Sequence, residues 1–102
     1  MTINAKTITL ISAVTANSNG EAYEWAGQGL GSLQVFGTFD TCTVTMQGSL
    51  DGGVTWTAIT SQAFTAASFA PFGAANCLVR AVVSSVGASS SVSAILTPQE
   101  VI

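Results

Sequence analysis

The sequence predicts an all-β protein, a single antiparallel β-sandwich with either a jelly-roll or an immunoglobulin-like Greek-key strand order. Three observations support this prediction. Short runs of alternating apolar and polar residues recur along the chain, and none follows the 3.6-residue spacing of an amphipathic helix. Thr, Ile and Val dominate these runs, and such side chains favour a pleated strand. Turn residues separate the runs at short intervals, and two sheets packed face to face would bury their apolar stripes.

The first two expected strands cover residues 6–14 (KTITLISAV) and 21–27 (EAYEWAG). The segment between them, 16–20, consists mainly of turn-forming residues. Tyr23 and Trp25 fall on one face of the second strand, because strand side chains alternate. We expect Trp25 to be partly exposed, which makes these two aromatics candidates for a protein interface or a glycan-stacking surface. Aromatic residues in a small sandwich more often fill its core, and this is the competing interpretation.

A strand over residues 32–39 precedes the clearest pattern, a β-hairpin over residues 42–59. Apolar and polar residues alternate strictly along its first strand, 42–50, as in a half-buried strand. The expected inward set is Val44, Met46, Gly48 and Leu50. Asp51-Gly52-Gly53 forms the turn, and Asp-Gly between alternating runs is a strong hairpin signal. Residues 54–59 are the expected return strand.

Three further runs complete the expected fold. Residues 68–72 contain a proline, which cannot donate a ladder hydrogen bond, so we expect them at a sheet edge or in a loop. Residues 77–85 are apolar on both faces apart from Arg80, which predicts a central strand. Residues 91–97 form the last expected strand.

Length and charge limit the organisation and the function classes. The 102 residues suit one domain, 1–102, with loose ends at 1–5 and 98–102. Lys6 and Arg80 are the two basic residues, too few for a nucleic-acid-binding patch or a basic membrane-surface helix. Charged residues make up 7% of the chain, against about 25% in an average soluble domain. We therefore expect much of the surface to contact other subunits; the alternative is an uncharged, Thr/Ser-rich soluble surface.

The residue inventory predicts a protein without catalytic, cofactor or metal sites. Histidine is absent, which excludes Ser-His-Asp and Cys-His catalysis. Glu21 and Glu24 are the closest carboxylates in sequence, but an offset of three places them on opposite faces of a strand and not as a glycosidase pair. Cys42 and Cys77 make a poor zinc site without histidine. We interpret them as small apolar side chains in preference to a disulfide, because the sequence shows no sign of secretion.

The stretch SLDGGVTW, Ser49 to Trp56, has the spacing Ser-x-Asp-x-Gly-x-x-Trp and resembles the Asp-box hairpins of sialidase-type propellers. The motif occurs once, and 102 residues are too few for a single-chain propeller. Its residues have local roles: Asp51 can accept backbone N–H bonds across the turn, Gly52 or Gly53 supplies a positive φ, and Ser49 and Trp56 complete the hairpin. We therefore interpret SLDGGVTW as a structural hairpin and not as part of a glycan-cleaving site.

Residues 36–59 (FGTFDTCTVTMQGSLDGGVTWTAI) and 78–96 (LVRAVVSSVGASSSVSAIL) together resemble small β-sandwich virion structural proteins of tailed bacteriophages. These proteins show a threonine-rich strand, a Ser-x-Asp-Gly-Gly hairpin, a tryptophan and a late strand similar to Arg80-Ala-Val-Val. The resemblance implies a capsid decoration (cement) protein on the virion surface, made in the host cytoplasm.

The expected partners are the major capsid protein and further copies of the chain, in an oligomer such as a trimer. No nucleic acid or membrane is expected as a partner. The alternatives are a phage tail, neck or fibre component and, in another class, a carbohydrate-binding or adhesin module. Tyr23, Trp25 and Trp56 are the aromatics that could stack on a sugar ring.

Overall fold

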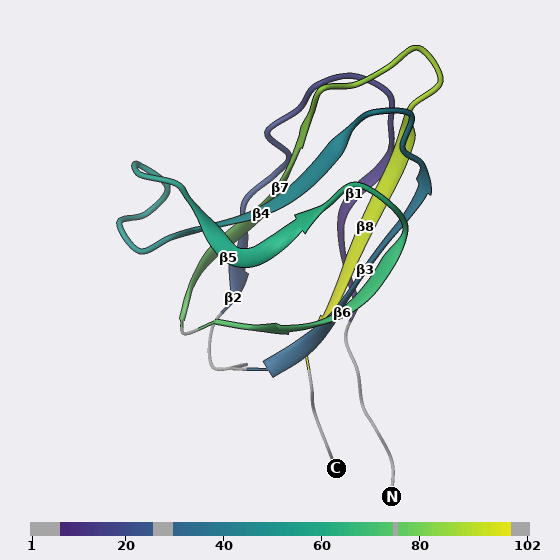
Figure 1. Cartoon of the computed structure of the whole chain (residues 1–102). Helices are drawn as coiled ribbons and strands as arrows, with labels where there is room; N and C mark the ends of the chain where they lie inside the picture. Colours follow the sequence, from purple (N-terminus) through teal and green to yellow (C-terminus); the bar gives the residue numbers. More distant parts are fainter. Residues whose placement is uncertain (1–6, 26–29, 75, 99–102) are drawn as a thin grey trace, which may run out of the picture.

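Eight strands in two four-stranded antiparallel sheets make up the part of the chain that the structure describes (Figure 1). The computed structural model describes residues 7–25, 30–74 and 76–98. The strands are β1 Ile8–Val14, β2 Tyr23–Trp25, β3 Leu30–Thr38, β4 Thr43–Ser49, β5 Thr57–Phe64, β6 Ser68–Gly73, β7 Cys77–Ser84 and β8 Ser91–Pro98. The prediction of an all-β, antiparallel sandwich is confirmed for these residues. They include no helix that is long and apolar enough to cross a membrane.

The two sheets have the strand orders β1-β8-β3-β6 and β2-β7-β4-β5, and we call them the β1 sheet and the β2 sheet. Each strand from the first half of the chain pairs with one from the second half: β1 with β8, β2 with β7, β3 with β6, and β4 with β5. Successive strands therefore alternate between the sheets, except β4 and β5, which form a hairpin within one sheet. The expected positions of β6 at an edge and β7 in the centre are both confirmed.

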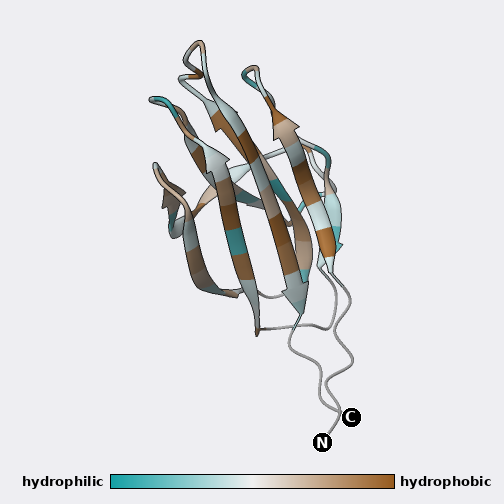
Figure 2. Ribbon diagram, turned by 90° about the vertical axis from the view of Figure 1, so that its right-hand side faces the viewer, coloured by the Kyte–Doolittle hydropathy of each residue, from teal (hydrophilic) through white to brown (hydrophobic). Residues whose placement is uncertain are grey.

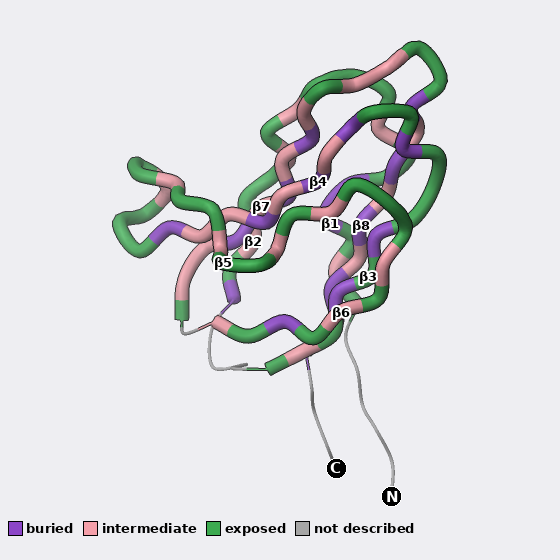
Figure 3. The backbone as a smooth tube through the Cα atoms, viewed as in Figure 1, coloured by how far each residue is buried: buried purple, intermediate pink, exposed green. Residues whose placement is uncertain are grey.

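The hydrophobic core lies between the two sheets, because alternate residues of the facing strands point inward. Burial alternates along β7 and β8 in step with the two-residue period of a strand (Figure 3). The largest fully buried side chains are Trp25, Phe72, Leu33, Met46, Leu96, Val35, Val44, Val79, Val83, Val92 and Cys42. Both cysteines are free thiols, as we expected, with Cys42 buried and Cys77 half-buried.

Trp25 is the largest side chain of this core, and its exposed fraction is 0%. The expectation that its ring is partly exposed was therefore wrong. The ring meets Phe72 of β6 edge to face, with centroids 5.3 Å apart and planes at 89°. Gly31 of β3 makes room for it, because a Cβ at this position would lie 2.9 Å from the Trp25 ring and 2.5 Å from the Thr97 carbonyl oxygen. Trp25 thus joins β2 to the opposite sheet and has no surface to offer a glycan.

Two other expectations about individual strands were wrong. Leu50 does not continue the inward face of β4; β4 ends at Ser49, and Leu50 lies in the following loop with 84% of its surface exposed. The return strand β5 starts at Thr57 instead of residue 54 and continues to Phe64 through a register shift opposite β4. The hairpin therefore has a longer loop, 50–56, than a tight Asp-Gly turn requires.

The ends of the chain can be compared with the prediction only in part. The expected loose ends, 1–5 and 98–102, lie outside the described residues except for Pro98. Pro98 closes β8 and is buried. The regular strand thus extends one residue past the predicted boundary.

We expect Trp25→Ala to lower the free energy of unfolding by about 3–5 kcal/mol, because it removes a fully buried aromatic side chain and leaves a cavity. Urea unfolding followed by far-UV circular dichroism measures the change. Leu50→Ala, at an exposed position, is the control and should stay within about 0.5 kcal/mol of the wild type. Equal costs for the two variants would contradict the assignment of Trp25 to the core.

Candidate binding surface

The loop 50–56 forms the end of the β4–β5 hairpin, and its tip extends past the sheets at the left of the view in Figure 1. The motif residues of SLDGGVTW all lie in this loop or at its base: Ser49, Asp51, Gly52, Gly53 and Trp56. Most of the loop is exposed, whereas Ser49 at its start is buried (Figure 3). The loop is held from within, as its hydrogen bonds show.

The Asp51 carboxylate is the centre of the loop. Its Oδ1 accepts hydrogen bonds from the Thr55 N–H (2.8 Å) and from the Ser49 hydroxyl (2.8 Å). The Ser49 oxygen in turn accepts the Gly53 N–H at 2.9 Å. These three bonds fix both sides of the loop to one carboxylate.

These hydrogen bonds favour the charged form of Asp51. Chiefly the Thr55 N–H, and then the Ser49 hydroxyl, lower the pKa of this carboxyl from 3.8 to about 2. The group lies at the surface, so solvent screens its contribution to stability. At neutral pH the carboxylate stays ionised, and its Oδ1 binds two groups of its own loop.

Two glycines and a tryptophan complete the loop. Gly52 and Gly53 have φ values of 75° and 91°, a region that side-chain-bearing residues rarely adopt. The Trp56 indole N–H donates to the Gly53 carbonyl at 3.0 Å. The Trp56 ring lies under the Arg80 guanidinium, whose central carbon is 4.3 Å from the ring centroid.

The loop folds back over the outer face of the β2 sheet. Arg80 of β7 stacks on Trp56 and also donates through Nε to the Gln47 side chain on β4, at 2.9 Å. A Cβ at Gly53 would lie 3.6 Å from Leu78 Cδ1 on the same strand. On β7 one face therefore meets the core, while Leu78 and Arg80 on the other face meet the hairpin loop.

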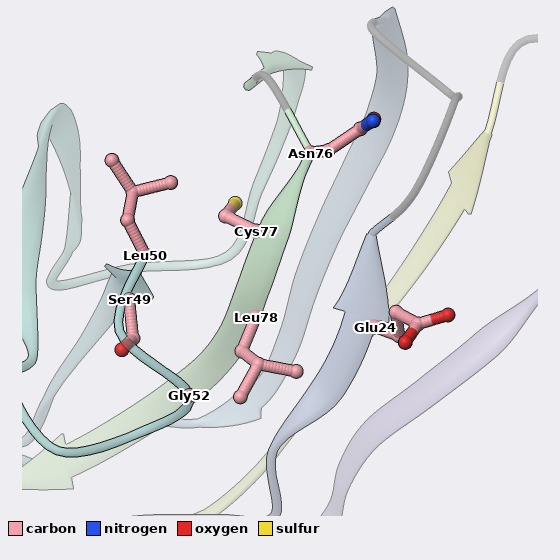
Figure 4. Close-up of a pocket in the computed structure, with 7 residues that line it drawn as sticks. All are labelled: Glu24, Ser49, Leu50, Gly52, Asn76, Cys77 and Leu78. Atoms are coloured by element: carbon pink, nitrogen blue, oxygen red, sulfur yellow. The ribbon is translucent and has the colours of Figure 1, made fainter.

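Two apolar side chains of the loop point to solvent. Leu50 is 84% exposed and Val54 is 82% exposed. A hollow of about 330 Å³ lies on one side of Leu50, between the loop and the ends of β7 and β2. It is lined by Glu24, Ser49, Leu50, Gly52, Asn76, Cys77 and Leu78 (Figure 4). A second hollow, lined by Gly48, Leu50, Asp51, Thr55 and Thr57, lies on the other side. Leu50 therefore stands as a ridge between two hollows.

This arrangement suits contact with another protein. An apolar ridge flanked by hollows can interlock with side chains of a partner surface. The alternation pattern misplaced Leu50 in the core, because the strand period alone does not show where a strand stops. The loop-forming glycines that follow Leu50 were the signal for the true boundary.

The predicted aromatic surface does not form. Trp25 is buried, and Tyr23 is half-buried against the edge of the core, with its hydroxyl donating to Glu21 at 3.1 Å. Burial, followed by the contact with Glu21, raises the pKa of Tyr23. Trp56 lies elsewhere, on the outer face of the β2 sheet, with Arg80 against its ring. The three aromatics therefore share no common face.

The side chain of Asp40, the other loop aspartate, also accepts a hydrogen bond from the backbone of its own chain. Its Oδ2 accepts the Ser89 N–H at 2.7 Å and so links the β3–β4 loop to the β7–β8 loop. Within the described residues, no three Asp, Glu, Cys or His side chains lie close enough to hold a metal ion together.

No protein-family model matches the chain, and no curated protein sequence matches it significantly. Among solved structures, the crystal structure of SPBc2 prophage-derived protein YomS is similar, with a TM-score of 0.73 and 18% sequence identity. The match covers 95% of this chain and 96% of that chain. At this identity the likeness establishes a shared fold over nearly the whole chain.

We expect Asp51→Ala to lower the melting temperature at pH 7, because the Thr55 N–H and the Ser49 hydroxyl lose their acceptor. Asp51→Asn keeps an acceptor oxygen and should lose less. Since folding lowers the pKa of Asp51 to about 2, its charge stabilises the fold above the ordinary carboxyl pKa of 3.8 and stops doing so as the pH falls through 2.

Thermal melts from pH 7 to pH 2 measure this dependence. Between pH 4 and pH 2 the melting temperature of the wild type should fall by more than that of Asp51→Asn. Parallel curves for the two proteins would show that the Asp51 carboxylate does not hold the loop as its geometry indicates.

Proposed function

We propose that this protein is a non-enzymatic structural component of a bacteriophage particle, which decorates the capsid surface and stabilises the shell. The observation that carries the proposal is the self-bonded loop 50–56, which presents Leu50 and Val54 to solvent without any reactive group. The likeness to a prophage-derived protein of the same fold supports the phage setting. So does the resemblance of residues 36–59 and 78–96 to small virion proteins.

We also infer that the sandwich has jelly-roll order. It pairs β1 with β8, β2 with β7, β3 with β6 and β4 with β5, as in one long hairpin of eight strands in four pairs that is folded over into two sheets. Eight strands in two Greek keys are the usual jelly-roll arrangement, which occurs in viral capsid domains and lectins. Fold alone does not decide function; the hairpin loop 50–56 is the feature that favours a docking role.

The loop has the properties of a docking element. Its hydrogen bonds to Asp51 order it before binding, so little conformational entropy remains to be lost on contact. Burying an exposed Leu or Val side chain contributes about 1.5–3 kcal/mol. Leu50 and Val54 can therefore anchor the contact, while the hollows beside Leu50 receive side chains of the partner.

The proposed partner is the major capsid protein, at junctions between its subunits. A stable contact of this kind buries about 1,200–2,000 Å² in total, and many copies around a shell add avidity. Bridging two capsid subunits raises the barrier to their separation under the pressure of packaged DNA. The protein is proposed to act as a small homo-oligomer on the capsid surface, after synthesis in the host cytoplasm, without binding nucleic acid or membrane.

The structure supports the alternative functions, an enzyme, a glycan-binding module and a tail component, to different degrees. The absence of histidine and the internal bonding of Asp40 and Asp51 favour a non-enzymatic role. A carbohydrate-binding or adhesin module would use an exposed aromatic platform, and the burial of Trp25 and the cover of Arg80 over Trp56 argue against one. A tail, neck or fibre component remains the nearest alternative within a phage particle.

Copy number per particle distinguishes these roles. We expect purified particles to contain this protein at a ratio comparable to that of the major capsid protein, measured by quantitative mass spectrometry. A ratio of a small fraction would place it in the tail or neck. Absence from particles would overturn the virion proposal.

We expect the double variant Leu50→Ser/Val54→Ser to bind particles that lack the protein at least tenfold more weakly than the wild type, with its melting temperature nearly unchanged. The loss follows from removing the two exposed apolar anchors. The matched control Leu50→Met/Val54→Ile keeps the apolar surface and should bind normally. Wild-type occupancy of particles by the serine variant would show that loop 50–56 is not the docking element.

A further inference from the structure

The outer face of the β1 sheet carries no charged side chain. Its four strands, β1, β3, β6 and β8, contain no Asp, Glu, Lys or Arg. The charged residues of the described part of the chain lie in the β2 sheet or in loops: Glu21, Glu24, Asp40, Asp51 and Arg80. A whole exposed sheet face without charge is unusual, because soluble surfaces normally intersperse charges of both signs.

Large apolar side chains cluster on this face. On β3, Leu33 and Val35 point into the core, so the even-numbered residues point outward. Phe36 is 39% exposed there, and on the neighbouring strand β6 Phe69 is 73% exposed. Brown and pale bands alternate along the strands in the view of Figure 2.

The strand register brings these side chains together. Gln34 of β3 pairs with Phe69 of β6 on one side and with Ile95 of β8 on the other. Phe36 is two residues along β3, within diagonal reach of both. Leu30 extends the apolar surface toward the far end of β3, where it pairs with Gly73. We call Gln34, Phe36, Phe69 and Ile95 the β1-sheet patch.

The two outer faces of the sandwich differ. On the β2 sheet the hairpin loop covers β7 and supplies Trp56 to Arg80. On the β1 sheet Phe69 and Phe36 remain open to solvent, although they are larger than the side chains that the loop covers. An uncovered apolar face of this kind points to a partner.

We propose that the β1-sheet patch binds the same patch of a second copy of this chain. The absence of charge on this face indicates which partner it takes. A charged partner surface would lose its hydration on this face and find no opposite charge in return, which is costly. The favoured partner is therefore equally free of charge and equally apolar, and the β1 sheet itself meets both conditions. The inference concerns a different surface from the docking loop and does not depend on the particle role.

The geometry of the face fits a two-fold dimer. Four strands are about 19 Å wide and the longest of them, β3, spans about 30 Å, so the face covers roughly 570 Å² at most, near the lower end of the roughly 600–1,000 Å² that each partner of a standard interface buries. A self-complementary patch closes with two copies, and two sheets pack face to face at about 30°. The proposed oligomer is therefore a dimer. From the sequence we expected an oligomer such as a trimer.

A dimer of this form keeps the docking loops free. Loop 50–56 belongs to the β2 sheet, on the side opposite the patch, so each dimer presents two loops that point outward. Two linked loops can engage two capsid subunits at once, which gives the avidity that bridging requires.

Sedimentation velocity of the full chain at concentrations from about 1 to about 100 μM, which span typical dimer affinities, tests the proposal. The wild type should shift from monomer to dimer. Phe69→Lys places a charge in the patch and should remain a monomer over the whole range. Its dimerisation would then be at least tenfold weaker than that of the wild type. Thr60→Lys adds the same charge at an exposed position of β5, in the other sheet, and should dimerise like the wild type. Thermal melts establish that both variants are folded.

Two results would overturn the proposal. One is a wild type that stays monomeric throughout, in which case binding of that monomer to particles through Phe69 would identify the capsid as the occupant of the face. The other is dimerisation of Phe69→Lys with wild-type affinity, which would place the self-contact elsewhere. Since Leu50→Ser/Val54→Ser tests particle binding and Phe69→Lys tests dimerisation, failure of one proposal is distinguishable from failure of the other.

Discussion

The β4–β5 hairpin at the middle of the chain is the pair around which the other strand pairs are arranged. β4 and β5 are adjacent in sequence and form the innermost pair, and β3–β6, β2–β7 and β1–β8 enclose it in turn. Each outer pair joins residues farther apart in the chain, and its closure costs less entropy once the inner pair has formed. The Asp51 carboxylate, which closes the β4–β5 loop, thus acts at the point where the chain reverses. The buried Ser49 hydroxyl and the exposed Asp51 carboxylate stabilise this reversal of the chain.

The same loop determines how the two outer faces differ. By folding back, it covers β7 and gives the Arg80 guanidinium an aromatic surface to lie on. Nothing equivalent covers the β1 sheet in the described part of the chain. The protein consequently has one face that its own hairpin loop partly covers and one whose apolar side chains remain open, and the four strands of the open face contain no charged residue. Both proposals, the docking loop and the dimer face, follow from this asymmetry.

The sequence predicted the strands well because burial in a sandwich has a two-residue period. Alternation located β4, β7 and β8, and the proline of β6 indicated an edge. The failures occurred where long-range pairing decides the outcome. Leu50 continues the alternation of β4 but lies past its last paired residue, and Trp25 is buried because Phe72, 47 positions later, packs against it. The β1-sheet patch was invisible for the same reason: Phe36 and Phe69 become neighbours only through the register of β3 and β6.

The nested order also places the two ends of the described chain side by side. Ile8 lies opposite Leu96 in the β1–β8 ladder, and the hydroxyl groups of Thr7 and Thr97 are 3.1 Å apart. A force that pulls these ends apart therefore acts on one rung of the ladder at a time and is not shared among all of them. We expect such a pull to open the β1–β8 ladder first, while β8 stays paired with β3 through eight further residue pairs.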